Sequence, residues 1–262
     1  MRDELQLRVD GLRGGYGDRE IIHGVSFTVD TGDVLCILGP NGCGKSTLLK
    51  LMLRIHPKTG GAVFYRSENV DSMSRRRLAQ CFSYIPQSGL IAFPYTALEI
   101  VTMARTSHIA ALGSPKEVDI ETAMRCLLNL KLGDIAYAQF NELSGGQRQL
   151  ILIARALCQG ACIMFMDEPV SNLDFANQKL INDAVRMIAD EGKIVVICTH
   201  SPSQPFEIAN KALLLNNGNM AGFGATDEVI TAEALTAVYR IPMEIVTVTD
   251  QNQKRRKICL DL

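Results

Sequence analysis

A glycine-rich loop between an apolar strand and a helical run constrains this chain more than any other feature. Residues 39–47 read Gly-Pro-Asn-Gly-Cys-Gly-Lys-Ser-Thr and match the pattern GxxxxGK[ST]. The apolar run 34–38 precedes the loop, and a helical stretch over 45–53 follows it. A glycine-rich turn can match this pattern by chance, but the order strand, loop, helix makes the match specific. The sequence therefore predicts a sheet with one strand that ends at this loop.

The residue types in the loop predict a phosphate site. Glycines let successive backbone N–H groups converge on phosphate oxygens, and the start of the helix adds a partial positive charge. We expect Lys45 to reach the β- and γ-phosphates, Ser46 to ligate Mg²⁺ and Thr47 to donate to an α-phosphate oxygen. The residues expected to bind the phosphates are Gly39, Pro40, Asn41, Gly42, Cys43, Gly44, Lys45, Ser46 and Thr47.

Cys43 lies inside the loop, where Lys45 and the helix start are expected to lower the pKa of its thiol. Alkylation of such a thiol would place bulk where phosphate must sit. The alternative is a thiol that packs out of reach of reagents.

The second apolar run covers residues 162–166, and the carboxylates of Asp167 and Glu168 follow it directly. In an open α/β sheet, the carboxyl ends of the strands hold the ligand. We expect Asp167 to hold Mg²⁺ through water, and Glu168 to orient or deprotonate the attacking water. The alternative for such a pair is a helix N-cap, but the phosphate loop favours the catalytic interpretation.

The hydrophobic patterns predict an α/β fold with a P-loop NTPase core and a parallel sheet. Continuous apolar runs at 34–38, 162–166 and 194–198 are typical of parallel strands covered on both faces, and helical stretches at 45–53, 147–158 and 175–190 separate them. Alternating apolar residues predict an N-terminal antiparallel β subdomain, which includes Leu5, Leu7, Val9, Val25, Phe27 and Val29. Between residues 87 and 144 the spacing becomes helical, at 97–104 and 120–130, which indicates an inserted helical subdomain.

We therefore expect one domain over residues 1–248, with a core of 1–87 and 159–248, a helical subdomain of 88–158, and a short basic tail of 249–262. The tail carries Lys254, Arg255, Arg256 and Lys257, which could touch acidic lipid. A solvated terminus is the favoured interpretation.

Composition limits the class of protein. The chain has 262 residues, of which 47% are hydrophobic and 21% charged, as in ordinary globular proteins. A net charge of -1 provides no general basic field for nucleic acid. The apolar runs are shorter than the ~18 to 20 residues of a membrane helix, and the start of the chain does not resemble a secretory signal. Eight scattered cysteines without a zinc-ligand spacing indicate reduced thiols and a cytoplasmic protein.

A second glycine turn, Leu-Ser-Gly-Gly-Gln at 143–147, opens another helix and offers a second anion cradle. With this turn the sequence resembles the ATP-binding cassette family over roughly residues 5–248. The resemblance implies ATP and Mg²⁺ as cofactors and a homodimer. In that dimer Ser144, Gly145, Gly146 and Gln147 of one subunit cover the γ-phosphate held by the other.

Further positions match the family in its usual order. The resemblance implies that Tyr16 stacks on adenine, although a core or turn tyrosine is the alternative. Gln87 matches the residue that ligates Mg²⁺ and links the core to the insertion. Asp174 lies in the loop that crosses the dimer interface, and His200 matches the histidine at the γ-phosphate. The expected catalytic residues are thus Glu168, His200 and Gln87, and the expected metal ligands are Ser46, Gln87 and Asp167.

The subfamily resemblance is divided. Residues 93–100 and 103–108 resemble the ATPases of iron-siderophore, haem and cobalamin importers, although Ala104 replaces the usual glycine. Residues 143–156, 209–211 and 241–243 are also similar to the molybdate and tungstate ATPase of the same group.

The resemblance implies an ATPase subunit, peripheral on the inner face of the cell membrane, that drives a separate membrane permease and imports a metal chelate such as an iron siderophore. The other implied partner is a substrate-binding protein, which acts indirectly, and no nucleic acid is expected. The alternatives are import of molybdate, tungstate, haem or cobalamin, a soluble cassette ATPase, an exporter ATPase, or a P-loop kinase or GTPase, which would lack the turn at 143–147. We expect residues 88–95, including Ile91 and Phe93, to form the groove for a permease helix; the alternative is that they pack the insertion onto the core.

Overall fold

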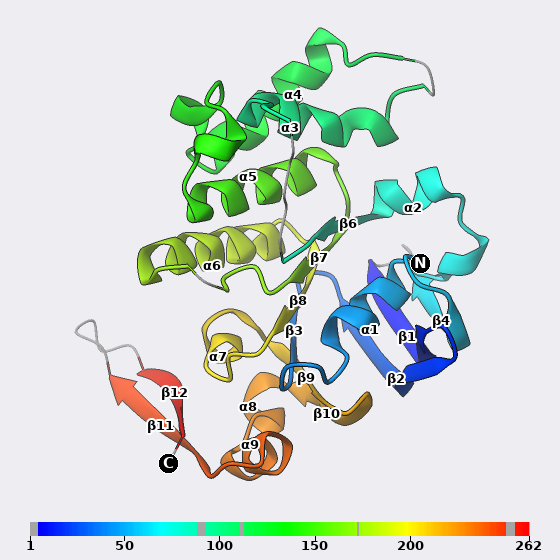
Figure 1. Cartoon of the computed structure of the whole chain (residues 1–262), viewed down its shortest axis with the longest axis vertical. Coiled ribbons are helices and arrows are strands. Elements are labelled where there is room, and N and C mark those ends of the chain that lie inside the picture. Colours follow the sequence, from blue (N-terminus) through cyan, green and yellow to red (C-terminus); the bar gives the residue numbers. More distant parts are fainter. Residues whose placement is uncertain (1–4, 88–92, 111–112, 172, 250–254, 262) are drawn as a thin grey trace. The chain divides into compact units, whose positions relative to one another are not determined.

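The computed structural model describes residues 5–87, 93–110, 113–171, 173–249 and 255–261 (Figure 1). The chain forms two compact units. The first consists of Met1–Met73 with Val185–Leu262, and the second is Ser74–Ala184. Each unit carries part of the predicted site.

An antiparallel sheet begins the first unit. Its strands, in spatial order, are β2 (Arg19–Asp30), β1 (Gln6–Tyr16), β4 (Lys58–Tyr65) and β5 (Glu68–Asn69). Alternate side chains of β1 are buried, and Leu7 lies opposite Val29 while Val9 lies opposite Phe27. This register confirms the predicted antiparallel subdomain, because period-two burial places the apolar side chains on one face.

Parallel strands form the other half of the first unit. β3 (Val34–Leu38) pairs in parallel with β8 (Ile194–Thr199) on one side and with β9 (Lys211–Asn216) on the other. β10 (Asn219–Ala225) then pairs antiparallel with β9. Every residue of β3 and β8 is buried, as the continuous apolar runs predict.

Asp33 fixes the start of β3. Its carboxylate accepts hydrogen bonds from the side chain of Asn210 at 2.6 Å and the backbone N–H of Asp30 at 2.7 Å, and it forms an ion pair with Lys211 at 2.6 Å. Burial acts to raise the pKa of Asp33, but these hydrogen bonds hold it below its usual range. An ionised Asp33 thus ties the entry of β3 to the start of β9.

The predicted basic tail contributes a strand to a hairpin, in which Arg255 and Arg256 are exposed. α9 (Ala232–Tyr239) is followed by a hairpin of β11 (Met243–Thr249) and β12 (Arg255–Asp261). Cys259 packs against the buried cluster that includes Leu235 and Val238, and Lys257 pairs with Asp227 at 2.8 Å. In β12 three basic residues are followed by three apolar ones; Cys259 packs inward, whereas Ile258 and Leu260 are exposed.

The second unit is mainly helical, as the spacing between 87 and 144 predicts. The helices α3 (Ala97–Thr102), α4 (Glu117–Asn129) and α5 (Gly145–Cys158) pack together in the upper part of Figure 1. β6 (Phe82–Ile85) pairs in parallel with β7 (Ile163–Asp167), and β7 is buried throughout. Among the described residues, no helix combines the length and hydropathy needed to cross a bilayer.

The remaining helices are short, apart from α6. The boundary between the two units lies within α6, after Ala184. These helices are α1 (Lys45–Met52), α2 (Arg75–Cys81), α6 (Phe175–Asp190), α7 (Gln204–Ile208) and α8 (Thr226–Val229).

Candidate functional site

The glycine-rich loop lies between β3 and α1, as predicted. Gly44 precedes the helix with φ 111°, a conformation that side chains rarely adopt, and a Cβ there would lie 2.8 Å from Cδ1 of Ile22. At Gly39, a Cβ would meet the carbonyl oxygen of Leu215 at 2.3 Å. Both positions therefore require glycine, which lets the loop pass close to its neighbours.

Lys45 is a charged residue, but it is buried, with only 6% of its surface exposed. Its ammonium group donates to the carbonyl oxygens of Gly39 at 2.8 Å and Pro40 at 3.0 Å. A buried ammonium needs such partners, because its desolvation is costly. These contacts hold the side chain of Lys45 across its own loop, and its contact with phosphate stays a prediction.

Cys43 does not have the predicted electrostatics. Burial raises the pKa of its thiol, and the effect outweighs the opposing influence of Lys45. The residue is 3% exposed, and its backbone carbonyl accepts from the N–H of Gly218 at 2.9 Å. The expectation of a lowered thiol pKa is therefore wrong, because burial of the thiolate costs more than the nearby positive charge returns.

Tyr16 is half exposed at the end of β1. Its ring meets the ring of His56 edge-on, with centroids 4.7 Å apart and an angle of 66° between the planes. The exposed fraction of 47% shows that Tyr16 is not a core residue, but the other alternative, a turn tyrosine, remains, because Tyr16 pairs with Arg19 across the turn after β1. Its free ring surface remains a candidate for stacking on a base.

His200 follows β8 directly and is exposed. Its backbone carbonyl accepts a hydrogen bond from the hydroxyl of Tyr239 at 3.1 Å. Burial, together with the thiols of Cys43 and Cys259, raises the pKa of Tyr239, so its hydroxyl stays a donor. Tyr239 thus ties the end of α9 to the segment of His200.

In the second unit, Asp167 and Glu168 follow one another at the end of β7, as predicted. Asp167 is 4% exposed and accepts a long hydrogen bond of 3.4 Å from the hydroxyl of Tyr84. Glu168 has φ 49°, an uncommon backbone conformation for glutamate, and its carbonyl accepts from the hydroxyl of Ser171 at 2.9 Å. Backbone conformations of this kind are frequent at functional sites.

Gln87 and Glu168 are brought together, although they are far apart in sequence. The side-chain amide of Gln87 donates to Oε2 of Glu168 at 2.9 Å. Gln87 follows β6, which runs beside β7, so parallel pairing places the two strand ends together. The structure therefore joins two of the three residues that the sequence predicts to be catalytic.

The turn at Ser144–Gln147 forms the predicted start of α5. Ser144 and Gln147 make a reciprocal capping box, with the hydroxyl of Ser144 accepting at 3.3 Å and the side chain of Gln147 accepting at 3.0 Å. Gly145 is exposed. A Cβ at Gly146 would lie 2.1 Å from the side-chain oxygen of Asn177, so the backbone must approach α6 closely.

Asp174 also contacts Asn177. Its carboxylate accepts from the backbone N–H and from the side-chain amide of Asn177, both at 2.8 Å, and these bonds lower the pKa of Asp174. Asp174 thus caps α6 from the loop before it, of which Asn172 lies outside the described residues.

Asn177, Tyr84 and Tyr239 contact the predicted site residues but do not figure in the sequence analysis. Asn177 stands three residues after Asp174, the spacing of a helix cap, and that signal could have identified it. The two tyrosines act through tertiary hydrogen bonds, which leave no periodic trace in the sequence.

The comparisons with known proteins agree with this geometry. The profile of the family described as ABC transporter matches residues 22–171, which is more than half of the chain. The chain therefore belongs to the ATP-binding cassette (ABC) transporter family, as an ATP-binding subunit.

Two relatives align with this chain over nearly their full length. The chain is 41% identical over 240 residues to the molybdate import ATP-binding protein MolC of Haemophilus influenzae, covering 90% of this chain and 89% of the relative. It is 31% identical over 255 residues to the iron(3+)-hydroxamate import ATP-binding protein FhuC of Bacillus subtilis, covering 97% and 94%.

Solved structures support the fold. A chain from an inward-facing ABC transporter assigned to the metal-chelate type superposes with a TM-score of 0.89, at 37% identity and 98% coverage of both chains. The ADP conformation of the ATP-binding cassette MJ1267 superposes with a TM-score of 0.80 at 24% identity, covering 90% of this chain and 98% of the other.

The burial of Cys43 generates a prediction. We expect N-ethylmaleimide to leave Cys43 unmodified in the folded subunit, with or without ATP, because the thiol is both buried and poorly ionised. Peptide mass spectrometry after a timed reaction measures this, with a denatured sample as the positive control. Modification of Cys43 in the native subunit that ATP prevents would contradict the prediction.

Proposed function

We propose that this chain is an ATP-hydrolysing subunit that dimerises and drives a separate membrane permease of an importer. The observation that carries the proposal is the hydrogen bond between Gln87 and Glu168. It connects the residue that precedes the insertion with the carboxylate best placed to act on water. A change in the position of the insertion would then reach the catalytic base through a single side chain.

The residues of the loop fit a nucleoside triphosphate. Gly39 and Gly44 keep the loop free of side-chain bulk, and Lys45 adds the positive charge. We propose that Gly39, Pro40, Asn41, Gly42, Cys43, Gly44, Lys45, Ser46 and Thr47 hold the phosphates and that Tyr16 stacks on adenine. Cys43 would contribute through its backbone alone, since its side chain is buried.

The donor set also fits Mg²⁺, because the hydroxyl of Ser46, the side-chain oxygen of Gln87 and the carboxylate of Asp167 are the hard oxygen ligands that this ion prefers. When bound, Mg²⁺ would neutralise charge on the β- and γ-phosphates. Asp167 is buried at the end of a strand and is thereby held in a fixed position for this role.

Glu168 is the proposed base. Its carboxylate would accept a proton from the attacking water, and its backbone conformation fixes where that carboxylate points. His200 would contact the γ-phosphate from the end of β8. The turn of Ser144, Gly145, Gly146 and Gln147, with Asp174, would complete the site of the partner subunit, so that two ATP molecules lie at the dimer interface.

The permease would dock on the segment that follows Gln87. Ile91 lies outside the described residues, but Phe93 is 65% exposed, which argues against the alternative that Phe93 packs the insertion onto the core. Exposed apolar side chains that gather on a surface can mark an interaction site. With no membrane span of its own among the described helices, the subunit would lie on the inner face of the membrane through this contact, with a substrate-binding protein as an indirect partner.

For the cargo, we propose a metal chelate such as an iron siderophore. The support is the structural likeness to a transporter of the metal-chelate type and the match to the iron(3+)-hydroxamate relative. A second candidate is molybdate or tungstate, favoured by the higher identity of 41% to MolC. Uptake of the labelled iron chelate and of molybdate, measured in cells with and without this subunit, distinguishes the two.

Replacing the proposed base tests the enzymatic part. We expect Glu168→Gln to lower the rate of ATP hydrolysis by about 10²- to 10⁴-fold while ATP still binds, because the phosphate contacts come from the loop. Size-exclusion chromatography with Mg-ATP should then show a closed dimer. Glu121→Gln, on the exposed side of α4, is the matched control. An unchanged rate in the Glu168 variant would refute the assigned role.

Replacing Phe93 tests the docking surface. We expect Phe93→Ser to leave the unfolding midpoint and ATP binding of the isolated subunit unchanged, because the side chain is exposed, and to reduce co-purification with the permease. Tyr137→Ser, which removes another exposed aromatic of the second unit, should have no such effect. If the Phe93 variant unfolds, the residue is part of the core; if it still assembles, docking occurs elsewhere.

A further inference from the structure

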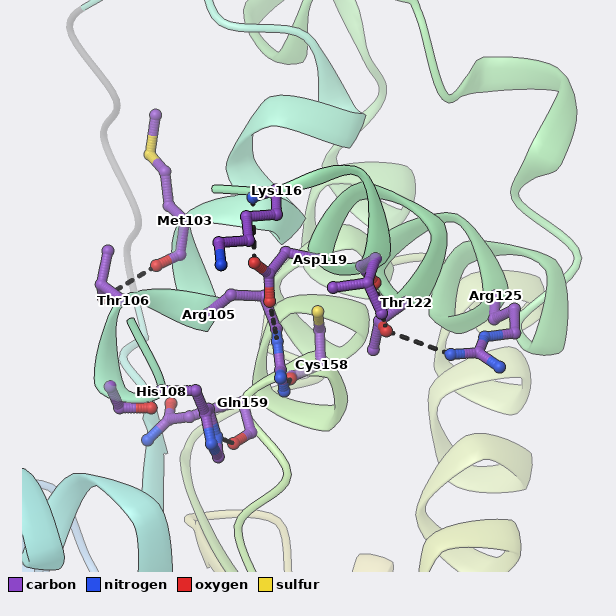
Figure 2. Close-up of polar contacts among 12 residues, drawn as sticks. Met103, Arg105, Thr106, His108, Lys116, Asp119, Thr122, Arg125, Cys158 and Gln159 are labelled. Atoms are coloured by element: carbon purple, nitrogen blue, oxygen red, sulfur yellow. Dashed lines mark hydrogen bonds and ion pairs between the residues drawn. The ribbon is translucent and has the colours of Figure 1, made fainter. Parts of the chain in front are cut away.

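The segment Met103–Ser107 and the following His108 have no role in the proposed function, although their sequence is distinctive. In the structure they form a short 3-10 turn after α3. Figure 2 shows the side chains of Arg105 and His108 at the carboxyl-terminal end of α5, beside the start of α4. Four segments of the second unit meet at this point.

Arg105 binds two of these segments at once. Its Nε donates to Oδ1 of Asp119 at 3.0 Å, and its Nη1 donates to the carbonyl oxygen of Cys158 at 3.2 Å. The other oxygen of Asp119 accepts from the backbone N–H of Lys116 at 3.0 Å, which caps α4. This backbone bond and Arg105 together lower the pKa of Asp119, so the pair stays ionised. One guanidinium thus joins the start of α4 to the end of α5.

His108 binds the next carbonyl of α5. Its Nε2 lies 2.8 Å from the carbonyl oxygen of Gln159, and since a carbonyl can only accept, Nε2 carries the hydrogen. The side chain of Gln159 donates in turn to the carbonyl oxygens of Ala79 and Phe82. Gly160 follows in the left-handed region, with φ 75°, and ends the helix.

α2 holds the same turn from the other side. Nε of Arg76 donates to the carbonyl oxygen of Ser107 at 3.0 Å and its Nη2 to that of His108 at 3.2 Å, while the amide of Gln80 also donates to Ser107 at 3.1 Å. α2 leads directly into β6, which ends just before Gln87. The end of α5 is therefore tied to α2 and to the strand that precedes Gln87.

The physical effect concerns the last turn of a helix. The final carbonyl groups of an α-helix have no partner within the helix and carry partial negative charge, which cationic donors satisfy and stabilise. Apolar residues along α5, from Leu150 to Ala154, are buried, and the hydrogen bonds at its end add contacts that depend strongly on direction. α5 has 14 residues, a length of about 21 Å, and its opposite end is the turn Ser144–Gln147.

We propose that Arg105 and His108 are positioning residues for the turn Ser144–Gln147: by binding the last carbonyl groups of α5, they set the direction in which the amide groups at the start of the same helix point. This inference rests on the proposed function, in which that turn completes the ATP site of the partner subunit. It predicts a defect that appears in the partner's site and not in the subunit's own.

Mixed dimers test the proposal, because they separate the two sites. Two full-length subunits with different affinity tags are combined, and dimers that carry both tags are isolated. One subunit contains Glu168→Gln, which retains ATP in its intact phosphate loop. The other contains Lys45→Ala, so that it offers only its turn Ser144–Gln147. The measured quantity is labelled ATP trapped per mixed dimer.

Arg105→Gln with His108→Gln is then placed in either subunit. In the subunit that offers only the turn, we expect trapped ATP to fall at least about tenfold, since small misplacements of a contacting group have effects of this size. In the subunit that offers only the loop, trapped ATP should stay within about twofold of the unaltered mixed dimer. Arg105→Lys, which keeps the charge but has one donor centre, should give an intermediate value and guards against loss of folding.

Equal losses in both arrangements would show that the two residues support folding only, and no loss in either would show that the end of α5 does not control its start; each result overturns the proposal. If the unaltered mixed dimer traps no ATP, the proposed function itself fails, and this inference fails with it.

Discussion

The buried ammonium group of Lys45 is the constraint on which the first unit depends. A charge in this position requires oxygen partners, and the loop provides them through the carbonyl groups of Gly39 and Pro40. The loop can curve in this way only because glycine occupies positions where a Cβ would collide with the neighbouring strands. Strand β3 and helix α1 are then fixed at either end of the loop, and Asp33 anchors the strand from its other end.

Much of this arrangement could be predicted from the sequence because its signals are local. The apolar runs that became β3, β7 and β8, and the glycines of the two turns, are each visible within a few residues. The environment of Cys43 could not be predicted in the same way, since it depends on how deeply the surrounding strands bury the thiol. Strand β12 was not predicted because its residues, Arg-Arg-Lys-Ile-Cys-Leu-Asp, lack the polar–apolar alternation of a half-buried strand.

In the second unit, the proposed catalytic base and the end of α5 are both bound by side chains that are distant in sequence. Gln87 reaches Glu168 because β6 and β7 run in parallel and end together. Arg105 and His108 reach the end of α5 because α2, α4 and α5 converge there (Figure 2). In the proposed mechanism, a shift of the insertion would therefore change the position both of the base Glu168 and of the turn Ser144–Gln147, which serves the partner subunit.

The central claim is that hydrolysis requires two copies of the chain, each of which completes the site of the other. The most direct measurement is the specific ATPase activity of the purified subunit as a function of its concentration, at saturating Mg-ATP. The account predicts that the activity per subunit rises with concentration and then reaches a plateau as dimers form. A constant activity per subunit at concentrations where light scattering shows only monomers would contradict it.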